Sequence, residues 1–175
     1  MSLFIYWWET FPFVQYFYGV LYAANFEGLH FSKVMPTGVT VTAAVYIDFL
    51  KEAVASFNTH QLIAARKTVR WENAVIMHDN APVHVAKATA TFLESKHCTT
   101  LKQPAYSPDT NLCDRMIFPL LEMRRRSIHF ESAESLELFL RDAAATLTSE
   151  IMMIEFEKLK LHCEEIINNN GDYIH

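Results

Sequence analysis

The sequence predicts an α/β domain in which a mixed sheet is flanked by helices and followed by a helical C-terminal part. Two observations carry this prediction: the order of the expected elements and the composition. Strands are expected first, strands and helices then alternate, and only helices follow, which is the order of an α/β layer domain. The chain has 175 residues, of which 51% are hydrophobic and 20% are charged, as in a single globular domain.

Two strands are expected near the start, at residues 14–24 and 29–35, because both stretches are rich in aromatic and β-branched residues. Residues 25–28 between them predict a turn, in which Gly28 supplies the backbone freedom that a turn needs. The second strand ends before residues 36–38, where a proline and a glycine break it.

A helix is expected to begin after Thr40 or Thr42, either of which can cap it, and to end near Phe57. The polar stretch 58–72 predicts a loop with a short helix. The apolar run 74–77 is bounded by polar residues, which is the pattern of a strand that helices cover on both faces.

The next helix is expected from Pro82 to about Lys96, since proline suits the first helical turn and Asp79 or Asn80 can cap it. A short strand at residues 99–103 follows, and then a loop with two prolines. Three helices complete the chain, expected at residues 112–126, 132–148 and 151–167.

The first part of the chain is an aromatic-rich stretch, residues 3–24, whose only charged residue is Glu9. No Lys or Arg precedes it, which argues against a signal peptide. Propensity favours a strand of the core; a membrane segment and non-native sequence from a faulty gene boundary stay open as alternatives. We therefore divide the chain into residues 1–19, of uncertain origin, and a domain at residues 20–175.

The net charge of −5 and the pI near 5.9 argue against binding of nucleic acid through the overall charge of the chain. Contacts with DNA would have to come from local basic patches. The three cysteines, Cys98, Cys113 and Cys163, are odd in number and form no Cys-x-x-Cys pair. A zinc ribbon and a disulfide framework are therefore not indicated, and reduced thiols of an intracellular protein are expected.

Two acidic residues stand where an α/β sheet presents reactive groups. Asp79 directly follows the expected buried strand, and ligands gather at the carboxyl ends of strands in such sheets. Asp114 begins the helix that follows the proline-containing loop. Phosphodiester cleavage uses such carboxylates, because Mg²⁺ prefers oxygen ligands and two ions about 3.5–4 Å apart can serve the attacking and leaving oxygens. By position alone, a helix cap explains an Asp after a strand equally well.

Two longer strings around these residues carry a resemblance to a known family. HDNAPVHVA (residues 78–86) resembles the segment of mariner-type transposases that holds their second catalytic carboxylate. YSPDTNLCDRMIFPLL (residues 106–121) is similar to the segment that holds their third. Between Asp79 and Asp114 lie 34 residues, which is the spacing of the mariner branch.

Two further strings, VMPTGVTVTAAVY (residues 34–46) and NNNGDYIH (residues 168–175), also match family segments in the same order, so the resemblance covers residues 20–175. It implies an RNase H-like fold and a reaction that cleaves and joins DNA strands with Mg²⁺ or Mn²⁺. It also implies transposon ends as the partner, a nuclear location and no small-molecule substrate.

Carried over position by position, the resemblance makes Asp79 and Asp114 the second and third catalytic metal ligands. Asp109 matches an acidic position of the loop, but it is off the ligand spacing and is expected to shape the turn. His84 matches the histidine of the motif, and we expect a structural role for it and for His78 rather than direct chemistry.

The first carboxylate of the family, an Asp on an upstream strand, has no counterpart here. The first Asp of this chain is Asp48, which falls inside an expected helix. Glu9 precedes the matching region, and Glu27 lies in a turn. We therefore expect no strand cleavage from this chain, because each lost ligand removes several kcal/mol of transition-state stabilisation. A helix-turn-helix region for recognising transposon ends is also not found in this sequence.

The basic residues Arg124, Arg125 and Arg126 are candidates for contacts with the DNA backbone, and a solvated surface explains them equally well. The leading hypothesis is thus a degenerate mariner-type transposase fragment. The alternative is a transposase-derived module that binds nucleic acid or protein without catalysis, with a homodimer as a further option if the aromatic N-terminus forms a surface.

Overall fold

The computed structural model describes residues 13–17, 20–25, 28–36, 38–63, 68–126 and 128–171. Its first half comprises β1 (Phe13–Phe17), β2 (Val20–Asn25), β3 (Gly28–Val34), α1 (Ala43–Ile63), the 3-10 turn η1 (Trp71–Asn73), β4 (Val75–His78), α2 (Pro82–Val85) and α3 (Lys87–Ser95). Its second half comprises β5 (Thr99–Lys102), the 3-10 turn η2 (Pro108–Thr110), the π-helical turn η3 (Cys113–Ile117), α4 (Phe118–Arg125), α5 (Ala133–Ala145) and α6 (Ser149–Asn168).

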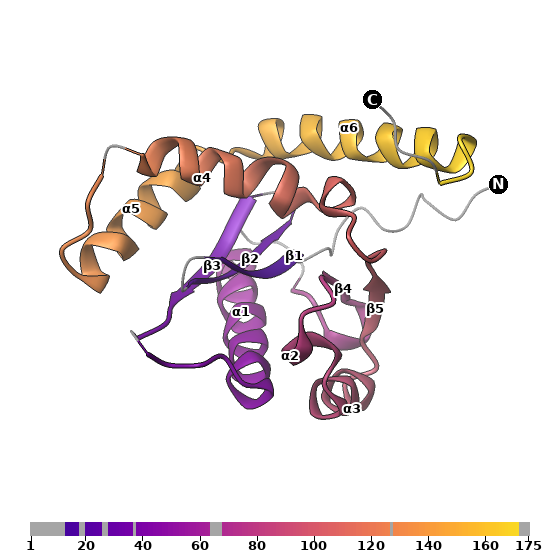
Figure 1. The fold of residues 1–175 in the computed structure, drawn as a ribbon. Coiled ribbons are helices and arrows are strands. Elements are labelled where there is room, and N and C mark those ends of the chain that lie inside the picture. Colours follow the sequence, from indigo (N-terminus) through magenta and orange to yellow (C-terminus); the bar gives the residue numbers. More distant parts are fainter. Residues whose placement is uncertain are drawn as a thin grey trace.

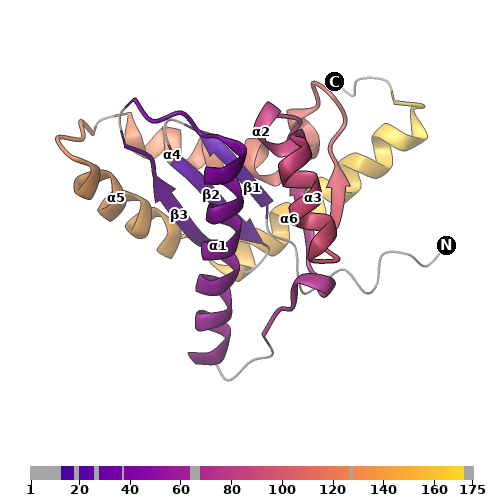
Figure 2. The ribbon, with the colours of Figure 1, turned by 90° about the horizontal axis from the view of Figure 1, so that it is seen from below.

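The five strands form one mixed sheet in the order β3-β2-β1-β4-β5. Strands β1, β2 and β3 are antiparallel neighbours, whereas β4 runs parallel to β1 and β5 runs parallel to β4. Helices α4 and α6 lie on one side of this sheet and α1, α2 and α3 on the other (Figures 1 and 2). The expected α/β architecture, a mixed sheet flanked by helices with a helical C-terminal part, is confirmed.

Strand β2 shows why both faces of the sheet need helices. Alternate residues of a strand point to opposite faces, and in β2 neither set reaches solvent. Val20, Tyr22 and Ala24 belong to one hydrophobic cluster, and Leu21 and Ala23 belong to the other, with no side chain more than 3% exposed. The strand therefore contributes side chains to both hydrophobic cores.

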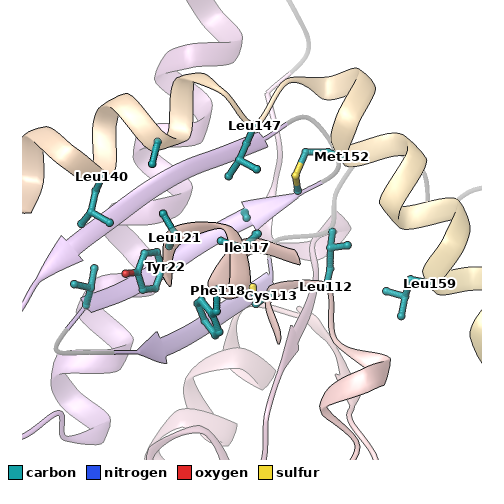
Figure 3. Packing of buried hydrophobic residues seen from close by; sticks show 13 residues of the cluster. Tyr22, Leu112, Cys113, Ile117, Phe118, Leu121, Leu140, Leu147, Met152 and Leu159 are labelled. Atoms are coloured by element: carbon teal, nitrogen blue, oxygen red, sulfur yellow. The ribbon is translucent and has the colours of Figure 1, made fainter. Parts of the chain in front are cut away.

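The first core lies between the sheet and the C-terminal helices (Figure 3). Ile117 of η3 is fully buried there, and the ring of Phe118 packs at 5.4 Å from the ring of Tyr22. Leu140 of α5 and Met152 of α6 close the same layer, each at most 2% exposed. This core fixes the place of η3 above the sheet.

The second core lies between the sheet and α1, α2 and α3. Tyr46, Phe49 and Leu50 of α1 are at most 1% exposed and pack with Ile76 of β4 and Leu93 of α3. Strand β4 is thus covered on both faces, as expected for the apolar run at residues 74–77, because Val75 and Met77 pack against the first core.

The expected single strand at residues 14–24 is wrong: the chain there forms two strands, β1 and β2. Their register pairs Phe17 with Val20, which leaves two residues for the connection. In the sequence, Gly19 is a signal for a break in a strand, and the strand propensity of its neighbours concealed it.

The expected continuous helix from Pro82 to about Lys96 is also wrong. Ala86 is extended, with φ −58° and ψ 141°, and separates α2 from α3. The hydroxyl of Thr89 donates to the carbonyl of Val83 at 2.7 Å, so it takes the acceptor that a continuous helix would offer to an amide one turn on. The N-cap of α2 is Ala81, and neither Asp79 nor Asn80 caps it.

The helix expected at residues 112–126 begins with the π-helical turn η3, in which the amide of Phe118 donates to the carbonyl of Cys113. Pro119 follows directly and has no amide with which to continue an α-helical ladder. Two other helix starts are confirmed, because Thr42 accepts from the amide of Val45 and Ser132 forms a capping box with Ser135. Helix α1 is longer than expected and runs to Ile63.

The aromatic N-terminus is described only in part. Residues 13–17 form β1 and pair into the sheet, whereas residues 1–12, with Glu9, lie outside the described residues. No described helix is long and apolar enough to cross a membrane. The division of the chain at residue 20 stays a prediction, although β1 joins the sheet of the domain that follows.

Candidate active site

The segments that carry the two predicted carboxylates both neighbour β1. Asp79 directly follows β4, which pairs with β1 in parallel, and Asp114 belongs to η3, which contacts β1. The thiol of Cys113 is fully buried, and its pKa is raised first by burial and then by the charges of Asp114 and Asp79. Both carboxylates therefore act on the same thiol, and the fold brings their segments to one region.

The side chain of Asp79 is held by two donors and remains 35% exposed. Its Oδ1 accepts a hydrogen bond from the amide of Ala81 at 2.9 Å and lies 2.6 Å from Nδ1 of His84. The hydrogen bond from His84 is the main reason why the pKa of Asp79 is lowered, with the Ala81 amide adding to the effect and burial opposing it. The carboxylate is therefore kept ionised, as a metal ligand must be.

Beneath Asp79 lies a buried group of three rings. The ring of His84 is 4.4 Å from the ring of Tyr46 and 4.9 Å from the ring of His78. Burial, and then the charge of His84, lowers the pKa of His78 to about 4, so His78 is neutral near pH 7. The phenol of Tyr46 and Nε2 of each histidine have no partner among the described residues.

Asp114 is the second residue of η3 and is partly buried. A π-helical turn inside a helix adds one residue to the loop that each hydrogen bond closes, and such turns are frequent at functional sites. The turn is anchored on both sides of Asp114, because Cys113 and Ile117 are both 0% exposed. The backbone at Asp114 therefore has a fixed position above the sheet.

A hydrogen-bonded path connects the segments of the two carboxylates. Asn80 donates from its side chain to the carbonyl of Gln103 at 3.0 Å. The Oε1 atom of Gln103 accepts from the side chain of Asn111 at 2.9 Å. The side chain of Asn111 in turn accepts from the amide of Cys113 at 2.8 Å. Asn80 follows Asp79 and Cys113 precedes Asp114, so the path spans the candidate site.

Gln103 and Asn111 are buried polar residues, 7% and 1% exposed, that sequence reasoning missed. Buried amides are expected to be fully hydrogen-bonded, so these two residues fix the loop between β5 and η3. Asn80, the third member, lies inside the motif HDNAPVHVA, which was a signal for it. Neither Gln103, at the end of the expected strand, nor Asn111, in the proline-containing loop, had such a signal.

Asp109 lies in η2 and connects that turn to α6. Its Oδ2 accepts from Nε2 of His162 at 2.8 Å, across 53 positions of sequence. Its backbone carbonyl accepts from the side chain of Arg115 at 3.2 Å. Asp109 thus makes a tertiary contact in addition to the turn role that was expected of it.

Of the remaining acidic residues considered, only Asp48 is described by the structure. Asp48 lies in α1, as expected, and pairs with Lys51 at 2.8 Å, which lowers its pKa. Glu9 and Glu27 lie outside the described residues. Because both were weak candidates for a substitute ligand, the site rests on Asp79 and Asp114.

The arginines at the end of α4 differ in their surroundings. Arg125 forms hydrogen bonds with Glu122 through Nε at 3.0 Å and Nη2 at 3.1 Å, and this pairing lowers the pKa of Glu122. Arg124 and Arg126 are exposed. These two are therefore better placed than Arg125 for contacts outside the chain.

Strand β1, which pairs with β4 and contacts η3, has no acidic residue. The parallel register pairs Val14 of β1 with His78 of β4, and Gln15 and Asp79 are the residues that follow this pair. All five residues of β1, FVQYF, are uncharged. In the part of the chain that the structure describes, no group of three His, Cys, Asp or Glu residues could hold a metal ion.

The donor set thus fits one metal arrangement and not another. Two carboxylates suit a single hydrated Mg²⁺, which binds through one or two carboxylates and keeps several waters. They do not suit a two-metal centre, which needs more oxygen ligands than Asp79 and Asp114 provide. The assignment of both residues as ligands stays a prediction.

Comparison with known proteins gives one family. The family described as DDE superfamily endonuclease matches residues 22–137. The mariner Mos1 transposase of Drosophila mauritiana is 26% identical over 151 residues, which is 85% of this chain and 42% of that protein. The human histone-lysine N-methyltransferase SETMAR is 23% identical over 145 residues, or 83% of this chain and 20% of that protein. The chain thus spans less than half the length of either relative.

Among solved structures, the catalytic domain of Mos1 mariner transposase superposes with a TM-score of 0.81 at 23% identity. The match covers 94% of this chain and 84% of that one. The RNase H-like fold that the sequence motifs implied is thereby confirmed, and so is the resemblance to mariner-type transposases.

Proposed function

This chain belongs to the DDE superfamily endonucleases, and from that premise we propose that it is a mariner-like transposase fragment that cannot cleave DNA. The parent activity would be metal-dependent cleavage and joining of DNA strands. In this chain Asp79 and Asp114 would keep their places as second and third ligands, whereas the first ligand would be missing.

One observation carries this proposal. Strand β1 neighbours the segments of both carboxylates, because it pairs with β4 and contacts η3, and none of its five residues is acidic. A strand in the right place without its carboxylate supports loss of the site more directly than a missing segment would. The relevant position is Gln15, because it follows Val14, which pairs with His78, the residue before Asp79.

Divalent metal is part of the proposal. The Mos1 catalytic domain has been solved with Mn and with Mg. When bound, such an ion would stabilise negative charge that develops on phosphate oxygens. In this chain we propose that Asp79 and Asp114 hold one ion weakly, because two carboxylates leave most of its coordination to water.

Transposon-end DNA is the proposed partner. Mos1 has been solved as a paired-end complex with the left transposon end. Arg124 and Arg126, exposed at the end of α4, are the proposed backbone contacts on this chain, and a nuclear location belongs to the same proposal. No observation on the described residues specifically favours the alternative, which is a binding module without catalysis.

The experiment restores the missing carboxylate. A labelled DNA substrate is incubated with Mn²⁺ and either the native chain or the Gln15→Asp variant, and nicked product is measured. We expect no nicking by the native chain and metal-dependent nicking by Gln15→Asp, since positions 15 and 79 follow the paired residues Val14 and His78. Tyr16→Asp, one register position along β1, is the matched control and should stay inactive.

Two outcomes would overturn the proposal. Robust nicking by the native chain that Asp114→Ala abolishes would show that the site works without a third carboxylate. Equal nicking by the Gln15→Asp and Tyr16→Asp variants would show that the register at β1 does not define the missing ligand.

A further inference from the structure

One ring nitrogen of His84 lies close to two oxygen atoms of Asp79. Its Nδ1 lies 2.6 Å from Oδ1 of Asp79 and 3.2 Å from the backbone carbonyl of the same residue. A carboxylate oxygen and a carbonyl oxygen only accept hydrogen bonds, so Nδ1 must carry a proton. A single N–H of His84 therefore restrains both the main chain and the side chain of Asp79.

The ring of His84 has little freedom to turn. It is 2% exposed, and it is packed against the ring of Tyr46 at 4.4 Å and that of His78 at 4.9 Å. Tyr46 belongs to α1 and is fully buried, so a core residue of a different helix packs against the histidine ring. A ring held in this way keeps its donor in one direction.

The carbonyl of Asp79 is held from a second side. Nδ1 of His78 lies 3.1 Å from it, and the amide of Ala81 donates to Oδ1 at 2.9 Å. Asp79 is thus restrained at its carbonyl by two histidines and at its carboxylate by His84 and Ala81. His84 reaches both.

We propose that His84 is a positioning residue, which fixes the orientation of the Asp79 carboxylate through its Nδ1 proton while Tyr46 holds its ring in place. This inference concerns the metal-free chain. Its consequence for metal binding rests on the function proposed above.

Two variants of equal shape test the role of the Nδ1 donor. Asparagine places an N–H close to where Nδ1 stands in histidine, whereas leucine has the same branching and no donor. The amide of Ala81 reports on the carboxylate, because it donates to Oδ1. In the metal-free chain, amide exchange at Ala81 should stay near the native rate in His84→Asn. It should accelerate roughly tenfold or more in His84→Leu.

A second readout needs no variant. Nitrogen-15 spectra of the native chain at neutral pH distinguish the two tautomers of His84, and the geometry requires the proton on Nδ1. A neutral His84 protonated at Nε2 would overturn the proposal, even if both variants failed to fold. Equal exchange at Ala81 in the Asn and Leu variants would overturn it as well.

Titration with Mn²⁺ by calorimetry is the third arm. The affinity should fall about 10- to 100-fold in His84→Leu and no more than about threefold in His84→Asn, with thermal unfolding measured alongside. If the native chain binds no Mn²⁺ while the Ala81 exchange still separates the two variants, the proposed metal site fails and the positioning role stands. If both variants lose affinity equally, His84 supports the fold and does not orient Asp79.

Discussion

His78 occupies a place where a positive charge is costly. It is 7% exposed, and burial together with the neighbouring His84 lowers its pKa from 6.5 to about 4. Between these two values the unfolded chain binds a proton that the folded chain does not. The contribution of neutral His78 to the free energy of unfolding is therefore fully present above about pH 6.5, and it is lost as the pH falls towards 4.

We expect the His78→Asn variant to lose less stability than the native chain over this range, by about 2–3 kcal/mol. Asparagine keeps an N–H for the carbonyl of Asp79 and has no group that titrates. Urea unfolding at pH 7, 6, 5 and 4 measures the difference, with the exposed His129→Asn as the control for removing a histidine. Parallel stability curves for the native chain and His78→Asn would contradict the assignment to His78.

Residue-scale features were predictable from the sequence where they lay inside a recognisable string. Asp79, His84 and Asn80 all belong to HDNAPVHVA, and the order strand, acid, helix followed from local pattern. The contact of Gln103 with Asn111 could not be predicted, because polar residues in a loop carry no sign of which are buried. The same holds for Asp109 and His162, which lie 53 positions apart.

At the scale of elements, the types of helix and strand followed from periodicity, and the breaks within them did not. Ala86 interrupts a helix because the hydroxyl of Thr89 captures a carbonyl, a competition between side chain and backbone that only the structure shows. The sequence shows Pro119, but it does not show that the turn before this proline is altered. There η3 forms in place of an α-helical turn.

The contact of His162 with Asp109 joins two elements, and it gives a second prediction. Because α6 holds η2 through this hydrogen bond, His162→Leu should destabilise the chain by about 1 kcal/mol and speed amide exchange in residues 107–117. His162→Gln places an N–H close to where Nε2 stands and should retain most of both. Urea unfolding and hydrogen exchange measure the effects. Identical behaviour of the Leu and Gln variants would show that the packing of the side chain matters and its donor does not.

For the molecule as a whole, the sequence predicted a mixed sheet covered by helices. It did not predict which strand lies at the centre of the sheet. The order β3-β2-β1-β4-β5 places the first described strand in the centre. Strand pairing across a long separation has no local signature, so the sequence left it open whether the aromatic N-terminus joined the sheet. This pairing bears on the candidate site, because the central strand pairs with β4 and contacts η3 and carries no carboxylate.

A sheet shared by two cores should make the molecule unfold as one unit. Leu50 of α1 and Leu140 of α5 are 1% and 2% exposed and lie on opposite faces, so they form a matched pair. Leu50→Ala and Leu140→Ala should each cost about 2–5 kcal/mol, whereas Leu138→Ala, 57% exposed, should cost under about 0.5 kcal/mol. Because β2 belongs to both cores, methyl signals from either face should disappear at one urea concentration in every variant. Loss of the α5 and α6 signals in Leu140→Ala, at a concentration where the α1 signals persist, would mean that the two layers are separate folding units.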